Sequence, residues 1–226
     1  MARFSRLEVL NRIVATGLMP VFYHPDAETA CQVATACAAG GATTFEFTNR
    51  GDEAPEVFRL LVQHCRKYAP TLILGAGTIF DEATAALFVA HGANFIVGPS
   101  FNPGVARFCN RRKIPYMPGC LTPTEIADAE EAGVEIVKVF PCESAGGPEF
   151  VKAILGPSPW TRIMPTGIHN LCQHSLMEWF NAGVTAVGVG GELMKTEFLE
   201  QRDYPAMTRH AEEMLGWVRA ARLTRA

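Results

Sequence analysis

Short apolar runs alternate with amphipathic segments along almost the entire chain, and this alternation constrains the fold more than any other feature. The apolar runs occupy residues 18–23, 43–47, 71–74, 94–97, 115–117, 136–140, 162–164 and 185–189. Between them, segments such as 26–39, 53–67, 81–91 and 124–131 carry apolar residues at three- and four-residue spacing. Compact apolar runs are typical of buried strands, and the longer spacing is typical of helices that cover a core. The sequence therefore predicts eight strands joined by crossover helices.

The predicted strands are apolar on both faces rather than on one, which is typical of parallel strands covered by helices. Eight such units in 226 residues favour a closed parallel barrel over an open sheet. A further helix precedes the first strand, because Ser5 and Glu8 have the spacing of a capping box and Gly17 follows the last apolar residue of the segment. We predict a (β/α)8 TIM barrel with an extra N-terminal helix, folded as a single domain over residues 1–226.

Charge and cysteine usage exclude several classes of protein. The formal net charge is -3, and the longest run of like charge is the tripeptide Arg111-Arg112-Lys113, so we expect no nucleic-acid partner. No apolar run is long enough for a membrane span or a signal peptide, so we expect no membrane partner. Seven cysteines are scattered without metal-binding or paired spacing, which suggests reduced thiols in the cytoplasm. The six histidines are equally dispersed, so no metal site is predicted.

Lys138 lies in the middle of the apolar run at residues 134–141, where an ammonium group must be paired or lose its proton. Burial and neighbouring cations favour the neutral amine, which attacks carbonyl carbons to form a Schiff base. The other four lysines lie in polar surroundings. Taken alone, the run is equally compatible with a lysine at a strand end whose amine reaches water.

Other polar residues occur at the ends of predicted strands, where barrel enzymes carry their active sites. Glu46 lies between two phenylalanines and is followed closely by Arg50, and Thr78 ends the sequence Gly75-Ala76-Gly77-Thr78. Glu46 could simply form a buried ion pair with Arg50 or Lys138, and Thr78 could be a helix N-cap. A closed barrel would nevertheless bring these residues together with Lys138 in one pocket.

With these residues in place, the chain resembles the class I 2-keto-3-deoxy-6-phosphogluconate (KDPG) and 4-hydroxy-2-oxoglutarate (KHG) aldolases over nearly its whole length. The matching stretches are Pro20-Val21, Phe45-Glu46-Phe47-Thr48-Asn49-Arg50, Gly75-Ala76-Gly77-Thr78, Ala93-Asn94-Phe95-Ile96-Val97, Ile114-Pro115-Tyr116-Met117-Pro118-Gly119, Thr122-Pro123-Thr124-Glu125-Ile126, Val137-Lys138-Val139-Phe140-Pro141 and Met164-Pro165-Thr166-Gly167. Their order and spacing make the resemblance specific.

The resemblance implies an aldehyde-lyase that releases pyruvate from a 2-keto acid through a Schiff base. It implies that Lys138 forms the Schiff base, that Glu46 is the general acid and base, and that Arg50 and Thr78 hold the substrate carboxylate. It also implies a homotrimer that needs no metal, and we expect no cofactor. Phe140 would add an apolar wall to the pocket, although it could equally be an ordinary core residue.

The resemblance is weaker at the end of the pocket that binds phosphate in the family. Thr166 and Gly167 match the first phosphate-binding turn, but Ile168 stands where a second glycine is expected. In the other turn, Gly190 and Gly191 are followed by Glu192, and no serine supplies a hydroxyl. Glu192 would repel a phosphate unless it points into solvent. The substrate could therefore be a 2-keto-3-deoxy sugar acid, its 6-phosphate or 4-hydroxy-2-oxoglutarate.

Two other classes of function remain compatible with the sequence. A barrel isomerase or synthase could use Glu46 as a base, with Lys138 serving only as a charge. A non-catalytic sugar-acid binding protein could keep the pocket without turnover, although the presence of both costly groups, Lys138 and Glu46, argues against that alternative.

Overall fold

The computed structural model describes residues 2–223, which fold into alternating strands and helices. The strands are β1 (Leu18–Phe22), β2 (Thr44–Thr48), β3 (Ile73–Gly77), β4 (Ile96–Val97), β5 (Tyr116–Met117), β6 (Gly119–Cys120), β7 (Val137–Val139), β8 (Ile163–Pro165) and β9 (Val187–Val189). The helices are α1 (Arg6–Thr16), α2 (Ala27–Ala39), α3 (Ala54–Tyr68), α4 (Glu82–His91), α5 (Pro103–Arg112), α6 (Pro123–Glu131), α7 (Gly147–Leu155), α8 (Gln173–Ala182), α9 (Thr196–Glu200) and α10 (Tyr204–Leu223).

The strands pair in parallel in two curled sheets, which confirms the predicted parallel α/β fold. One sheet has the order β5-β4-β3-β2-β1-β9, and the other has the order β6-β7-β8. The predicted strand at 115–117 corresponds to β5, and after Pro118 the chain continues into β6, which belongs to the other sheet. Proline has no N–H to donate, so it interrupts the hydrogen bonding between strands at this point. An isolated parallel bridge joins Thr166, just after β8, to Gly188 of β9.

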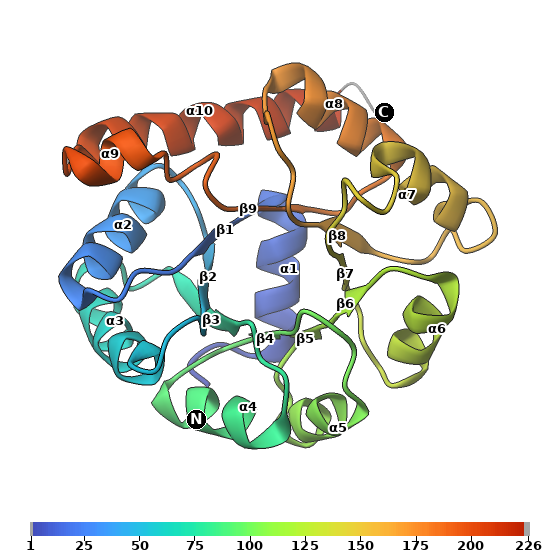
Figure 1. Cartoon of the computed structure of the whole chain (residues 1–226), viewed down its shortest axis with the longest axis horizontal. Coiled ribbons are helices and arrows are strands. Elements are labelled where there is room, and N and C mark those ends of the chain that lie inside the picture. Colours follow the sequence, from blue (N-terminus) through green and yellow to red (C-terminus); the bar gives the residue numbers. More distant parts are fainter. Residues whose placement is uncertain (1, 224–226) are drawn as a thin grey trace.

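The helices surround the strands, as Figure 1 shows, and α10 packs against both α8 and α2. Alternate residues of each strand face opposite sides. Phe45 and Phe47 of β2 belong to the large apolar cluster that the surrounding helices share, and Phe47 lies 6.0 Å from Phe58 of α3 between ring centroids. Val137 and Val139 of β7 belong to the same cluster. Glu46 and Lys138 therefore face the opposite side, toward the interior of the strand assembly.

Helix α1 closes the end of the interior where the strands begin. Val9, Leu10 and Ile13 of α1 are buried in one cluster with residues that include Met19 and Ile73, at the starts of β1 and β3. Ser5 caps α1 by accepting a hydrogen bond from the Glu8 N–H at 3.2 Å, which is one half of the predicted capping box. In Figure 1 this helix lies at the centre of the ring of helices.

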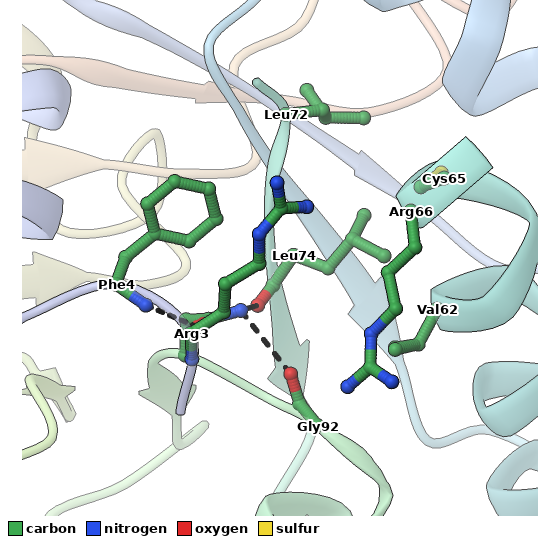
Figure 2. A pocket seen from close by; sticks show the side chains of 9 residues that line it. Arg3, Phe4, Val62, Cys65, Arg66, Leu72, Leu74 and Gly92 are labelled. Atoms are coloured by element: carbon green, nitrogen blue, oxygen red, sulfur yellow. Dashed lines mark hydrogen bonds between the residues drawn. The ribbon is translucent and has the colours of Figure 1, made fainter. Parts of the chain in front are cut away.

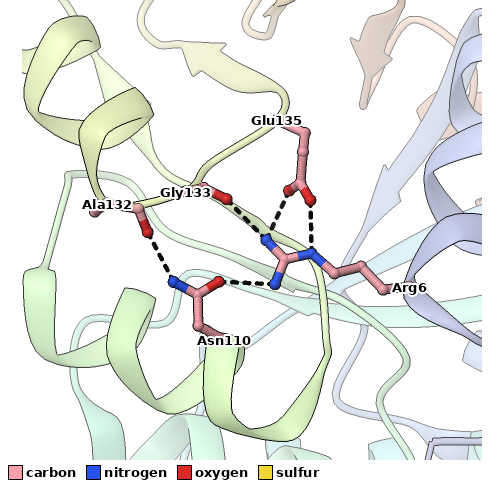
Figure 3. A network of polar contacts seen from close by, with 5 residues as sticks. All are labelled: Arg6, Asn110, Ala132, Gly133 and Glu135. Carbon is pink, nitrogen blue, oxygen red and sulfur yellow. Dashed lines mark hydrogen bonds and ion pairs between the residues drawn. The ribbon is translucent and has the colours of Figure 1, made fainter.

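Arg6 fastens α1 to the rest of the chain (Figure 3). Its guanidinium donates to the Glu135 carboxylate with an Nε to Oε1 distance of 2.7 Å, to the Asn110 side-chain oxygen at 2.8 Å and to the Gly133 carbonyl at 2.8 Å. Asn110 in turn donates to the Ala132 carbonyl at 2.7 Å. A single side chain thus links α1 to α5 and to the loop that leads into β7.

A second anchor holds the segment before α1, beside the small cavity in Figure 2. The Asn94 side-chain oxygen accepts hydrogen bonds from the backbone N–H groups of Arg3 and Phe4 at 2.8 and 3.1 Å, and its amide donates to the Leu74 and Gly92 carbonyls. The cavity measures about 20 Å³, which is room for one water molecule and not for a substrate. None of the helices in residues 2–223 is long and apolar enough to cross a bilayer.

Candidate functional site

A cleft of about 520 Å³ opens where the strands end. Its lining comes from the ends of β1 and β2 and from the loops after β7, β8 and β9. It is lined by Val21, Phe22, Tyr23, Thr48, Arg50, Phe140, Thr166, Gly167, Ile168, His169, Gly190, Gly191, Glu192, Met194 and Leu199. Of the residues predicted to bind substrate, Arg50, Phe140, Thr166, Gly167, Gly190 and Gly191 therefore lie together around one cleft.

Lys138 and Glu46 form a buried pair in the interior. Lys138 Nζ lies 3.9 Å from Glu46 Oε1, and the two side chains are 8% and 0% exposed. Glu46 is in register with Val21 on one side and Gly75 on the other, and Lys138 lies opposite Gly119 and Met164. The distance is long for a hydrogen bond, so the two groups attract each other electrostatically without being locked together.

The carboxylate of Glu46 is buried without a hydrogen-bond donor among the described residues. Burial raises the pKa of Glu46 above its ordinary value of 4.5, against smaller opposing effects of the positive charges of Lys138 and Arg50. A carboxyl group with a raised pKa can hold a proton near neutral pH and exchange it during a reaction. Natural proteins rarely leave such a group without a partner unless a substrate or water completes it.

Glycine in β3 makes room for this carboxylate. A Cβ atom on Gly77 would lie 1.9 Å from Glu46 Oε1, and one on Gly75 would lie 2.2 Å from the Phe95 ring. Gly77 therefore lets the backbone of β3 lie close to Glu46, so this glycine makes room for the predicted acid directly.

Phe140 lines the cleft, whereas Thr78 does not. Lys138 Nζ lies 5.0 Å from the centroid of the Phe140 ring, which forms part of the cleft wall. Thr78 is not part of the cleft lining, and neither are Lys138 and Glu46, which lie in the interior beside it. The alternative role suggested for Thr78 is wrong, because the N-cap of α4 is Asp81. Thr78 has a φ of 61°, an uncommon backbone conformation for a residue other than glycine.

Around the other end of the cleft, the loops after β8 and β9 are close together. Thr166 Oγ1 is buried without a hydrogen-bond partner, and a Cβ on Gly188 would lie 2.5 Å from it. Gly167 has a φ of 87°, which favours glycine at this position. Ile168 lines the cleft, but it is only 7% exposed and belongs to the apolar cluster.

Glu192 is partly exposed. Its Oε1 accepts a hydrogen bond from the Asn170 N–H at 2.9 Å, and the residue lines the cleft. Tyr23, Thr48 and His169 also line the cleft but were not predicted. Tyr23 and Thr48 lie at or just after the ends of strands, so the rule that identified Glu46 could have found both. His169 is in a loop, and the sequence gives no signal comparable to a strand end that would place it in the cleft.

No group of three or more His, Cys, Asp or Glu side chains within residues 2–223 is arranged to hold a metal ion. The interior instead presents an amine beside an acid whose carboxyl is poorly solvated. An amine can form an imine with a ketone, and an adjacent acid can move the protons that carbon–carbon bond cleavage requires. The fold and this pair define a class of enzyme, the carbon–carbon lyases that work through a Schiff base.

The comparisons with known proteins identify the family. The model of the KDPG and KHG aldolase family matches residues 9–210. The "2-dehydro-3-deoxy-phosphogluconate aldolase" of Pseudomonas aeruginosa is 31% identical over 214 residues, covering 93% of this chain and 92% of the relative. The protein of the same name from Haemophilus influenzae is 32% identical over 171 residues, 74% of this chain and 79% of the relative. The chain belongs to the KDPG and KHG aldolase family and is a class I aldolase.

A solved structure adds a chemical detail about a relative. The KDPG aldolase of Legionella pneumophila, with pyruvate captured at low pH as a covalent carbinolamine intermediate, has a TM-score of 0.80 to this chain at 26% identity. The similarity covers 89% of this chain and 95% of that one. The relative therefore forms a covalent adduct with pyruvate of the kind that precedes an imine.

Proposed function

We propose that this aldolase cleaves a 2-keto-3-deoxy sugar acid, its 6-phosphate or 4-hydroxy-2-oxoglutarate to pyruvate and an aldehyde. The function rests on the buried pair of Lys138 and Glu46, with 3.9 Å between Nζ and Oε1, beside a cleft large enough for such an acid. Membership of the family supports the same reaction. The names of these relatives support a keto-acid substrate; they refer to phosphogluconate derivatives or to KHG and KDPG, and not to an unphosphorylated sugar acid.

In the proposed reaction, the Lys138 amine attacks the C2 ketone of the substrate, and loss of water gives a protonated imine. The C3–C4 bond then breaks as the C4 hydroxyl loses its proton, and the bonding electrons flow into the imine to give an enamine. Glu46 takes that proton directly or through one water. The enamine is reprotonated at C3, and water hydrolyses the imine to release pyruvate and regenerate the amine.

Arg50 and Thr78 are proposed to bind the carboxylate next to the ketone. Arg50 extends into the cleft and presents the planar fork of donors that suits a carboxylate. Holding C1 would fix C2 against the lysine. Phe140 supports the same arrangement, because its ring lies beside the Lys138 amine and forms an apolar wall. Thr166, Gly167, Gly190 and Gly191 would contact the distal part of the substrate.

We extend the proposal to the whole chain, as a single domain over residues 1–226 whose strands close into the eight-stranded barrel. Closure on one side is supported by the bridge between Thr166 and Gly188 and by the hydrogen bond from the Thr185 N–H to the Ile163 carbonyl at 2.9 Å. On the other side, the Gly119 N–H donates to the Gly98 carbonyl at 3.0 Å. A cytoplasmic homotrimer, expected from the cysteine pattern and the family resemblance, completes the proposal; light scattering would measure the trimer.

Trapping with borohydride tests the proposed chemistry. Incubation with pyruvate and borohydride should attach a reduced three-carbon adduct to Lys138, because the reagent reduces an imine to a stable amine. Mass spectrometry of a digest locates the adduct. Lys138→Arg should abolish it, whereas Lys152→Arg, at an exposed helical lysine, should leave it unchanged. EDTA should not change activity. An unmodified Lys138, or an adduct on another lysine only, would favour the non-covalent isomerase or the binding protein.

A further inference from the structure

Two consecutive backbone N–H groups in the loop between β8 and α8 donate hydrogen bonds to carboxylates of the chain itself. The His169 N–H donates to Glu143 Oε1 at 3.2 Å, and the Asn170 N–H donates to Glu192 Oε1 at 2.9 Å. Backbone N–H groups in loops before helices are common ligands for phosphate and other anions. In this loop, two of those donors are already bonded to carboxylates that are part of the chain itself.

Glu192 is held in place from two sides. Its carboxylate accepts a hydrogen bond from the Asn170 N–H. Its backbone carbonyl oxygen lies 3.0 Å from His210 Nε2, within hydrogen-bond distance. The residue lines the cleft. Within the described residues its second carboxylate oxygen, Oε2, makes no hydrogen bond. A fixed acceptor with one oxygen free is suited to receive a hydrogen bond from a substrate hydroxyl.

The charged residues that line the cleft also disfavour a phosphate at this end. Arg50 is the single arginine or lysine among the described residues that line it. In the proposed function this guanidinium is occupied by the C1 carboxylate, so the lining offers no second cation to a phosphate group. A phosphate beside Glu192 would also meet a like charge, and the two would repel each other.

We infer that the distal end of the cleft is built for an uncharged, hydroxyl-bearing terminus, and that the substrate is an unphosphorylated 2-keto-3-deoxy sugar acid. A terminal hydroxyl of the substrate donates to Glu192, while Glu143 and Glu192 keep the loop amides from binding an anion. The inference deepens the proposed aldolase function and rests on it.

The deciding measurement compares kcat/KM for 2-keto-3-deoxygluconate and for its 6-phosphate. The unmodified enzyme should prefer the free acid by about tenfold or more. Glu192→Gln removes the charge but keeps an oxygen for the Asn170 N–H, so the loop should be retained. This variant should raise kcat/KM for the 6-phosphate about tenfold or more and lower it for the free acid.

Glu178→Gln is the matched control, because Glu178 is an exposed carboxylate on α8 that neither lines the cleft nor accepts from the loop amides. It should leave the ratio of the two kcat/KM values within about twofold. A preference of the unmodified enzyme for the 6-phosphate, or an unchanged ratio in Glu192→Gln, would overturn the inference. Pyruvate trapping on Lys138 distinguishes failure of the proposed aldolase function from failure of the inferred substrate class. If no adduct forms, the aldolase function itself is refuted. If the adduct forms but the enzyme cleaves neither compound, only the substrate class is refuted.

Discussion

Glu46 is costly to bury, because it is a carboxylic acid with no exposed surface and no hydrogen-bond donor within the described residues. Lys138 offsets part of that cost from 3.9 Å away. The remaining imbalance gives a carboxyl that holds its proton more tightly than it would in water. Such a group is well suited to exchange protons with a substrate that enters the cleft.

Replacing this acid should separate binding from proton transfer. Glu46→Gln should still form the reduced pyruvate adduct on Lys138, yet cleave substrate about two to four orders of magnitude more slowly, the usual scale for losing a general acid or base. Steady-state kinetics and adduct mass spectrometry measure the two properties, with circular dichroism verifying the fold. Near-normal turnover would assign the proton transfer to another group.

The same variant should reveal the pH dependence of stability. Burial raises the pKa of Glu46 above 4.5, so between pH 4.5 and the raised pKa the folded state holds a proton that the unfolded state has lost. The stability associated with Glu46 is therefore fully present below pH 4.5 and is lost as pH rises through the pKa of the folded state. Glu46→Gln lacks this loss and should be more stable than the unmodified protein at neutral pH, by about 1–3 kcal/mol.

Urea unfolding at several pH values checks this expectation. The difference in the free energy of unfolding between Glu46→Gln and the unmodified protein should shrink as pH falls through the raised pKa of Glu46 toward 4.5, and should no longer change below 4.5. A difference that is constant with pH would show that the carboxyl does not titrate abnormally.

Strand β3 illustrates how one element can position a side chain of another. Its inward positions after Ile73 are glycines, and the space left by Gly77 contains the Glu46 carboxylate. Alanine at this position would place Cβ 1.9 Å from Oε1, and the buried carboxylate has little room to move. The glycine therefore belongs to the site although it has no side chain of its own.

Gly77→Ala should displace the acid. We expect a stability loss of about 1–3 kcal/mol from overpacking and a fall in kcat of about tenfold or more, while the Lys138 adduct still forms. Gly156→Ala is the control, since Gly156 has a helical φ of -55° and its Cβ would meet only ordinary contacts, at 3.6 Å and beyond. Equal kcat values for the two variants would argue that Glu46 tolerates the new methyl group.

The positions of the elements could be predicted well from the sequence, because apolar period and capping residues are local signals. The predicted N-terminal helix, for example, agrees with α1 between Ser5 and Gly17. Strand β6 was not predicted, because the apolar run ends at residue 117 and the two residues Gly119–Cys120 carry no signal of their own; only the pairing of β6 with β7 identifies it. The strand-end rule brought Arg50 and Phe140 to the cleft, but it did not place Thr78 there. The carboxylate caps of the distal loop depend on contacts between distant segments, for which the sequence has no local signal.

Arg6 carries the attachment of α1 to the body of the protein. Its side chain is 14% exposed and links the helix to Glu135, Asn110 and the Gly133 carbonyl. Arg6→Ala should lower the free energy of unfolding by about 2 kcal/mol or more, because it leaves several partly buried partners unpaired. The kcat of the folded enzyme should hardly change, since these contacts lie at the end of the interior away from the cleft.

Urea denaturation provides the measurement, and Arg12→Ala on the same helix provides the comparison. No hydrogen bond or ion pair of Arg12 is found within residues 2–223, so its removal should cost at most about 0.5 kcal/mol. Similar losses in both variants would mean that helix propensity, and not the Arg6 network, accounts for the effect.

The apolar cluster beneath the site has a further consequence for traffic into and out of it. Ile136, Met164, Met117 and the buried face of α1 belong to one apolar cluster that fills the interior below Lys138. A dry plug of this kind gives solvent no rear entrance. Substrate, the water that hydrolyses the imine and both products must therefore pass through the same opening of the cleft. The aldehyde has to leave before pyruvate can be released.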